Sequence, residues 1–246
     1  MNNKIIVVGP VILDRHYFIN EYPKESNLAT INDTSTSVRG AGNLIIDLAK
    51  LDNSLDIVVN SVIGCDEAAS LINEEFSPYK NIDMSYTTKL DSTPVTYVMN
   101  SSLTKQRTFF FDPASNKDFD INHINLNDID GGILQVEYIG LIGKLMDEDT
   151  EFGSKIAKIL YMAQQKGIKT SIDMVSKSDE KTIRVARSAL KYSDYCCVNE
   201  LEASSISSIK IKDDQNNIIE ENLVQALYKI KELGVSTWVV IHSSLF

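Results

Sequence analysis

Short apolar runs alternate along the chain with longer segments in which apolar residues recur every three or four positions. The runs are rich in β-branched residues and do not alternate with polar ones, which is typical of strands buried on both faces of a parallel sheet. These predicted strands are Ile5–Val8, Ile57–Val62, Tyr138–Ile142, Thr170–Asp173, Tyr195–Val198 and Trp238–Ile241. Helical spacing is found in Ala41 to Leu51, Phe152 to Lys166 and Glu221 to Leu233. This order predicts an α/β fold with a doubly wound, mostly parallel sheet flanked by helices.

Two stretches break this rhythm and predict a small β-sheet lid beside the main sheet. Residues 15–38 are polar and rich in Thr, Ser and Asn, a composition that favours strands over a helix. Residues 93–111 form a predicted β-hairpin whose polar turn lies around Ser101 to Lys105. Such an excursion serves as a lid or a dimer surface, or is only a surface extension. We therefore expect one domain over residues 1–246, with lid segments at about 15–38 and 93–111.

Composition narrows the class of protein. The 246 residues are 43% hydrophobic and 24% charged, enough for a sizeable core. The longest apolar runs fall far short of the roughly 18 residues that cross a bilayer, so no membrane segment is expected. The net charge of −10 argues against nucleic acid as a partner. Cys65 and the pair Cys196-Cys197 have no metal-binding spacing, and no signal peptide is recognised, which favours the cytoplasm.

The first candidate for chemistry is Asp14, which follows the first strand and the Gly9-Pro10 break. Ligands of open α/β sheets bind outside the carboxyl ends of the strands, where this carboxylate could accept hydrogen bonds from a polar ligand. The alternative is an aspartate that caps a turn. A dinucleotide fingerprint needs several glycines here, and Gly9 is the only one.

Two further clusters lie at predicted helix starts. Gly40 and Gly42 would let a ligand approach the backbone closely, and Asn43 offers both a donor and an acceptor to a hydroxylated substrate. Asn199 and Glu202 follow a strand, where they could hold a hydrated Mg²⁺. The alternative is a helix N-terminus in which Asn199 is the cap and Glu202 completes a capping box.

Taken in order, these segments resemble the ribokinase-like, or PfkB-type, family of carbohydrate kinases, from Ile5 to the last residue. The resemblance is carried by the first strand with Asp14, Arg39-Gly40-Ala41-Gly42-Asn43, Val62-Ile63-Gly64-Cys65-Asp66-Glu67, Gln106-Arg107-Thr108, Ser171-Ile172-Asp173 and Asn199-Glu200-Leu201-Glu202-Ala203. The last of these is the most specific match.

The resemblance implies ATP-dependent phosphoryl transfer to a hydroxyl of a sugar or sugar-like substrate. By this analogy Asp14, Gly40, Gly42 and Asn43 bind the substrate. Asn199 and Glu202 position the ATP and Mg²⁺ cofactors, with Glu202 acting on the metal through water. Arg107 is a candidate substrate contact on the lid, and its alternative is a solvated hairpin charge. The lid would exclude water from the transfer, and it implies a homodimer.

The sequence departs from the family pattern in two places. Arg39 stands where the family has the first glycine of a pair, which leaves open whether the substrate is a neutral polyol or an anion.

The Gly-Ala-Gly-Asp segment that carries the family's catalytic base is absent. We considered Asp66, Asp112, Asp173 and His242 as replacements and name no base, since none precedes a glycine-rich helix start. We therefore expect an incomplete and inactive kinase chain. The alternatives are a non-catalytic sugar-binding or regulatory pseudokinase, and a structural module built on the lid.

Overall fold

The main body is a seven-stranded parallel sheet between two layers of helices. The computed structural model describes residues 3–127, 129 and 131–243. The strand order is β13-β12-β11-β10-β1-β4-β6, and every neighbouring pair is parallel. The strands are β1 (Lys4–Val8), β4 (Asp56–Asn60), β6 (Ile82–Asp83), β10 (Ile133–Ile139), β11 (Lys169–Met174), β12 (Tyr195–Asn199) and β13 (Trp238–His242). Strands β4 and β6 follow one another on one side of β1, and β10 to β13 follow one another on its other side, so the order of the strands reverses at β1.

Each face of the sheet has its own hydrophobic core. On one face α1 (Ala41–Leu51) and α2 (Glu67–Phe76) cover Val7, Ile57 and Val59. The other face is covered by α3 (Lys155–Gln165), α4 (Glu180–Leu190), α5 (Glu200–Ser207) and α6 (Glu220–Glu232). Burial on both faces explains why the strands read as continuous apolar runs. Among the described residues, no helix is long and apolar enough to span a membrane.

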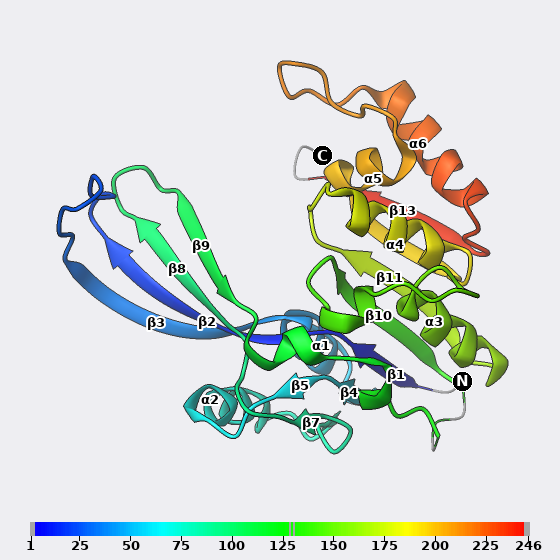
Figure 1. The fold of residues 1–246 in the computed structure, drawn as a ribbon, viewed down its shortest axis with the longest axis horizontal. Helices are drawn as coiled ribbons and strands as arrows, with labels where there is room; N and C mark the ends of the chain where they lie inside the picture. The colour runs from blue at the N-terminus through cyan, green and yellow to red at the C-terminus, as the bar shows by residue number, and fades with distance from the viewer. Residues whose placement is uncertain (1–2, 128, 130, 244–246) are drawn as a thin grey trace.

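The lid is a separate four-stranded sheet that extends away from the main body (Figure 1). Its order is β3 (Ile31–Gly40), β2 (Val11–Ile19), β8 (Val95–Ser101) and β9 (Arg107–Asp112). The prediction of a small β lid is confirmed, and β8 and β9 form the expected antiparallel hairpin. A short parallel pair, β5 (Val62–Ile63) with β7 (Thr88–Lys89), lies beside the sheet edge at which β4 ends.

One predicted strand was placed wrongly. The segment Tyr138–Ile142 was expected to be a strand, whereas β10 runs from Ile133 to Ile139. The polar residues Gln135 and Glu137 interrupt the apolar pattern, so the sequence does not read as a buried strand. The pairing with β11 is irregular between Val136 and Ile139, and the chain then leaves the sheet.

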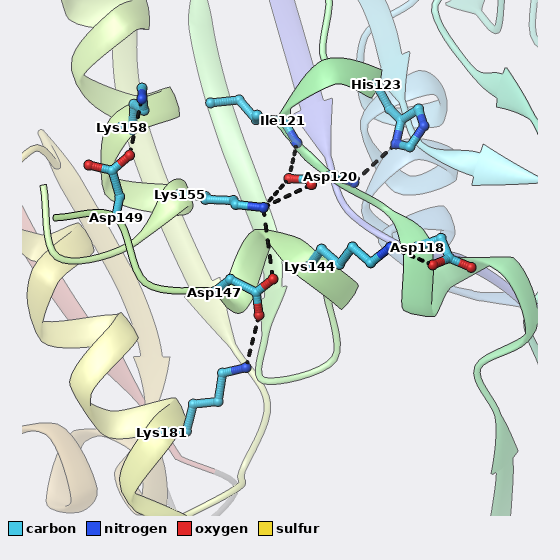
Figure 2. A network of polar contacts seen from close by, with 10 residues as sticks. All are labelled: Asp118, Asp120, Ile121, His123, Lys144, Asp147, Asp149, Lys155, Lys158 and Lys181. Atoms are coloured by element: carbon cyan, nitrogen blue, oxygen red, sulfur yellow. Dashed lines mark hydrogen bonds and ion pairs between the residues drawn. The ribbon is translucent and has the colours of Figure 1, made fainter.

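A network of ion pairs ties the loop between the lid and β10 to the helical layer (Figure 2). Lys155, at the first position of α3, donates to both carboxylate oxygens of Asp120, at 2.7 and 2.8 Å. Lys155 Nζ also lies 3.8 Å from Asp147, which in turn pairs with Lys181 on α4 at 3.2 Å. Positive and negative charges balance in this network, which indicates a structural role.

Candidate functional site

Polar side chains form a row along the carboxyl edge of the parallel sheet. Neighbouring strands contribute them in turn: Glu137 on β10, Asp173 on β11, and Asn199 at the end of β12, with Glu202 on α5 directly after it. Parallel strands present their carboxyl ends at the same edge, so residues far apart in sequence meet there. Glu137 and Glu202 are both close enough to Asp173 to influence its ionisation.

Glu137 and Asp173 are joined by a hydrogen bond between their carboxyl groups. Glu137 is 6% exposed, and Gln135 Nε2 donates to its Oε1 at 2.8 Å. Burial, together with the negative charges of Glu137 and Glu202, raises the pKa of Asp173 to about 9. A carboxyl with such a pKa keeps its proton near neutral pH, so Asp173 is the donor and Glu137 the acceptor of the shared bond.

Asn199 and Glu202 form a capping box at the start of α5. Asn199 Oδ1 accepts from the backbone N–H groups of Leu201 and Glu202, at 2.9 and 3.0 Å, while Glu202 Oε2 accepts from the Asn199 N–H at 2.9 Å. Glu202 Oε1 also accepts from Asn199 Nδ2 and from Ser176 Oγ, at 2.7 and 2.9 Å. The alternative weighed from the sequence, a capped helix N-terminus, is therefore present in the structure. Burial raises the pKa of Glu202.

The donors around Glu202 decide how it could act on a metal ion. Its two oxygens have about four lone-pair sites, and three donors already use them. One lone-pair site, on Oε2, remains for a further donor. Over residues 3–127, 129 and 131–243, no lysine or arginine forms an ion pair with Glu137, Asp173 or Glu202. In that same part of the chain, no group of three or more His, Cys, Asp or Glu side chains is arranged to hold a metal by itself.

Asp14 lies on β2, at the base of the lid, and is 7% exposed. Its neighbours in register are Ser37 on β3 and Thr96 on β8, and Thr96 forms a side-chain hydrogen bond with it. Burial raises the pKa of Asp14, against the opposing effects of Thr96 and of the positive charges of the lid. Asp14 is thus a strand residue, and the capped-turn alternative does not hold.

The start of α1 connects the lid to the sheet edge. Gly40 ends β3 with φ +63°, and the N–H of Ala41 donates to Pro10 O at 2.9 Å. A Cβ on Gly9 would lie 2.8 Å from Glu137 Cβ and 3.1 Å from Ala41 Cβ. Glu137 therefore lies directly beside the start of α1. The row of carboxyl groups continues past β1 to the helix that carries Asn43.

Asn43 is hydrogen-bonded to Arg39, the residue that departs from the family pattern. Arg39 Nη1 donates to Asn43 Oδ1 at 2.8 Å. The amide of Asn43 therefore keeps its N–H donors for another partner. Gly42 packs against Val38, whose Cγ1 would lie 2.2 Å from a Cβ at that position. This close packing requires a glycine at position 42 for structural reasons, independently of the predicted contact with substrate.

Tyr138 follows Glu137 near the end of β10. Its ionisation is influenced by the charges of Asp173, Glu137, Asp14 and Arg39. Burial raises the pKa of its phenol. Its φ of +62° is rare for a residue with a side chain, and such strain of about 1 kcal/mol persists where the surrounding structure imposes it.

The remaining candidates divide into structural and exposed residues. Asp66 caps α2 through Ala69 N, and it also accepts from the N–H and the hydroxyl of Thr93, at 2.8 and 2.6 Å. These bonds make Asp66 structural. Arg107 is exposed on β9, with its guanidinium 5.6 Å from the centre of the Phe109 ring. His242 ends β13 in register with Asn199, and its charge affects Glu202.

Sequence reasoning did not identify Glu137. The available signal was a glutamate within the apolar run from Ile133 to Ile139, since a lone carboxyl in a strand buried on both sides needs a partner or a ligand. Asp173 was considered from the sequence only as a replacement for the missing base. Its pairing with Glu137 follows from the order of the strands, which local sequence does not specify.

Comparisons with known proteins agree with this architecture. The sequence profile of the family described as pfkB family carbohydrate kinase matches residues 2–244. No curated protein sequence matches the chain significantly.

Three solved ribokinase structures are similar to the chain. The Arabidopsis thaliana ribokinase complexed with ribose and ATP has a TM-score of 0.71 at 17% identity, covering 98% of this chain and 72% of that one. The Thermotoga maritima ribokinase has a TM-score of 0.70 at 18% identity, with coverages of 96% and 70%. The Cryptococcus neoformans ribokinase in complex with ADP has a TM-score of 0.68 at 12% identity, with coverages of 97% and 72%. At these identities the likeness is one of fold.

Proposed function

Because this chain belongs to the pfkB family of carbohydrate kinases, we propose that it binds ATP and transfers a phosphoryl group to a hydroxyl of a sugar or sugar-like substrate. The observation that supports this most directly is the row of carboxyl groups from Glu202 through Asp173 to Glu137, continued by Asn43 on α1 and by Asp14 at the base of the lid. Carboxylate and amide groups are suited to binding hydroxyl groups, because each accepts hydrogen bonds from them.

The substrate end of this row comprises Asp14, Asn43 and Glu137. Asp14 would accept a hydrogen bond from one hydroxyl, and Asn43 would donate through the amide N–H groups that Arg39 leaves free. Glu137 would accept from a further hydroxyl beside the start of α1. Buried carboxylates bind hydroxyl groups more strongly than exposed ones do, because water does not compete with the ligand.

The nucleotide end comprises Asn199 and Glu202. A magnesium ion bound with ATP would neutralise phosphate charge, and the carboxylate of Glu202 would hold one of its water ligands. The absence of a lysine or arginine ion pair with Glu137, Asp173 and Glu202, within the described part of the chain, leaves negative charge that suits a cation at this end. The lid would exclude water from the bound substrate, because Asp14, a proposed substrate contact, lies on β2 of the lid itself.

The test is a pair of measurements on the purified protein. Isothermal titration with a panel of neutral, amino and phosphorylated sugars measures binding, and a coupled assay with ATP and Mg²⁺ measures the formation of ADP. We expect saturable binding of at least one sugar and sugar-dependent release of ADP. Binding without release would support the pseudokinase alternative instead. A protein that binds none of the sugars would contradict a carbohydrate site.

Asp14→Asn supplies the variant test, since it keeps the size of the side chain and removes its charge. Loss of a hydrogen bond to a charged group weakens binding about 10- to 100-fold. Asp33→Asn is the matched control: Asp33 is exposed on β3, in the same sheet, and the substitution changes the net charge equally. Equal effects of the two substitutions would assign Asp14 a role in charge balance only.

A further inference from the structure

Arg39 is linked to two of the residues that we propose to contact the substrate. Its Nη1 donates to Asn43 Oδ1 at 2.8 Å. Asp14 on β2 is in register with Ser37, which lies two positions before Arg39 on β3. Side chains two positions apart on a strand project from the same face, and a long side chain reaches its diagonal neighbour on the adjacent strand. Arg39 is therefore a direct partner of Asn43 and a diagonal neighbour of Asp14.

The hydrogen bond from Arg39 decides which atoms of Asn43 can face a ligand. An asparagine amide can turn either its carbonyl oxygen or its NH₂ group towards a given point, and the two orientations differ little in shape. A guanidinium group has donors only, so it pairs with Oδ1 and never with Nδ2. With Oδ1 engaged by Arg39, the amide offers its N–H groups to any further partner.

Charged groups on several strands act on the buried carboxyl of Asp14. Burial raises the pKa of Asp14, and a hydrogen bond with Thr96 on β8 opposes this effect, as do the charges of His16, Arg39 and Arg107. Burial lowers the pKa of His16, so this imidazole is mostly neutral near pH 7. The permanent positive charges are therefore Arg39 on β3 and Arg107 on β9, and of these two only Arg39 also binds Asn43.

The charge of Arg39 acts without occupying the oxygens of Asp14. Within the part of the chain that the structure describes, Arg39 forms no ion pair with a carboxylate. Its charge reaches Tyr138 on β10 as well, whose ionisation is also influenced by Asp14. An arginine that acts through space leaves lone pairs of Asp14 for hydrogen bonds from a ligand.

We propose that Arg39 is a positioning residue of the sugar site: it turns the Asn43 amide so that its N–H groups face the substrate, and it places positive charge beside the Asp14 carboxylate. This inference rests on the proposed sugar-binding function and specifies which hydrogen bonds the site forms. Asn43 then acts as a donor and Asp14 as an acceptor. A hydroxyl group fits both, because it donates and accepts, whereas an ammonium group fits Asp14 alone.

The first test follows the carboxyl carbon of Asp14 by NMR from pH 3 to pH 9 in the protein without ligand, with Asp14→Asn to assign its signal. Arg39→Met removes the charge and keeps an unbranched side chain, and Arg39→Lys keeps the charge. Loss of a nearby positive charge favours the protonated carboxyl. The midpoint of the Asp14 titration should therefore lie at higher pH in Arg39→Met than in the wild type, and close to the wild-type value in Arg39→Lys. An unchanged midpoint in Arg39→Met would overturn the proposal.

The second test is isothermal titration with D-fructose and D-ribose between pH 5 and pH 7.5. Without Arg39 the Asn43 amide is free to rotate, so Arg39→Met should weaken sugar binding about tenfold at pH 7.5. On acidification it should also lose affinity at a higher pH than the wild type does, because Asp14 takes up its proton there. Arg39→Lys should restore the pH dependence and part of the affinity. Equal affinities of Arg39→Met and the wild type at every pH would contradict the positioning role.

Arg15→Met is the matched control. Arg15 follows Asp14 on β2 and so projects from the opposite face, where it pairs with Glu67 at 2.7 Å. The substitution changes the net charge equally, and it should move neither the Asp14 titration nor sugar binding. If Arg39 had a structural role only, Arg39→Met would lower the temperature of unfolding and leave the Asp14 titration unchanged, which would overturn the proposal.

The outcomes separate this inference from the function on which it rests. If a sugar binds and the Asp14 titration does not depend on Arg39, the positioning role is wrong and the sugar site stands. If no sugar of the wider panel binds, the proposed function fails and the positioning role fails with it, whatever the titration shows.

Discussion

Glu137 and Asp173, on the neighbouring parallel strands β10 and β11, share a hydrogen bond that requires a proton between two carboxyl groups. Burial raises the pKa of both side chains, that of Asp173 to about 9. The pair lies in the middle of the sheet edge, with Tyr138 next to Glu137 in the chain and Glu202 on α5, which follows the neighbouring strand β12. The proton on Asp173 makes the pair carry one negative charge near neutral pH instead of two.

This pair makes the stability of the protein depend on pH. An acid whose pKa is raised by folding binds its proton more tightly in the folded state, so stability decreases as pH rises from about 4 towards about 9. Asp173→Asn keeps the donor to Glu137 and removes the titration. We expect the variant to be more stable than the wild type above pH 7, by on the order of 1 to 3 kcal/mol. Urea denaturation at pH 5, 7 and 9 measures this difference.

Asp56→Asn is the control for this prediction. Asp56 pairs with Lys4 at 3.0 Å, and its side chain is 47% exposed, so Asp56→Asn makes the same chemical replacement at a site away from the Glu137–Asp173 pair. Its effect on stability should be small and should not grow above pH 7. A difference between Asp173→Asn and the wild type that stays constant from pH 5 to pH 9 would show that Asp173 is not protonated in the folded protein.

The turn into α1 gives a prediction about a single glycine. Gly40 has φ +63°, and a Cβ at this position would lie 2.2 Å from the carbonyl oxygen of Pro10. Gly40→Ala must therefore move the backbone between β1 and β2, at a cost on the order of 3 kcal/mol. Gly167 has a similar φ of +71°, but a Cβ added there would have no other atom within 4 Å. Gly167→Ala should therefore cost only the conformational strain of about 1 kcal/mol. Thermal unfolding compares the two, and equal losses would contradict the close contact with Pro10.

Much of the fold follows from the local pattern of the sequence. The helix predicted over Ala41 to Leu51 has these bounds in the structure, because its apolar residues recur with a helical period and Asp52 ends it. The strands with continuous apolar runs were found for a similar reason. β10 was misplaced because the polar residues Gln135 and Glu137 interrupt its apolar pattern, and their partners, each other and Asp173, are set by the neighbouring strand.

The candidate site was predictable in part. Asp14, Asn43 and Asn199 could be singled out because each follows a strand or opens a helix, positions that sequence patterns locate. The pairing of Glu137 with Asp173 depends on the order of strands in the sheet, which is a non-local property. Spacing alone also could not distinguish a capping box from a ligand site at Asn199, because both uses require the same residues in the same places.

Substitutions at Asn199 separate these two uses. Asn199→Ala removes the acceptor for two backbone N–H groups and a donor to Glu202, so it should destabilise the protein by about 1 to 2 kcal/mol. Asn199→Ser keeps an N-cap acceptor and should lose about half of that or less. Urea denaturation measures both effects. If the Ser variant is stable but binds ATP with Mg²⁺ more weakly than the wild type does, the amide also contacts the nucleotide. An Ala variant as stable as the wild type would contradict the capping role.

The ion-pair network of Figure 2 predicts a difference between two lysines that both pair with aspartates. Lys155 is 23% exposed and donates to both oxygens of Asp120, which is 25% exposed, whereas Lys144 and Asp118 are 50% and 46% exposed. Water screens the second pair more strongly, so Lys144→Met should change the free energy of unfolding by less than about 0.5 kcal/mol. Lys155→Met leaves Asp120 half-buried without its cation and should cost about 1 to 2 kcal/mol. Both are measured by urea denaturation at low and high salt, and a larger loss for Lys144→Met would contradict this assignment of the network.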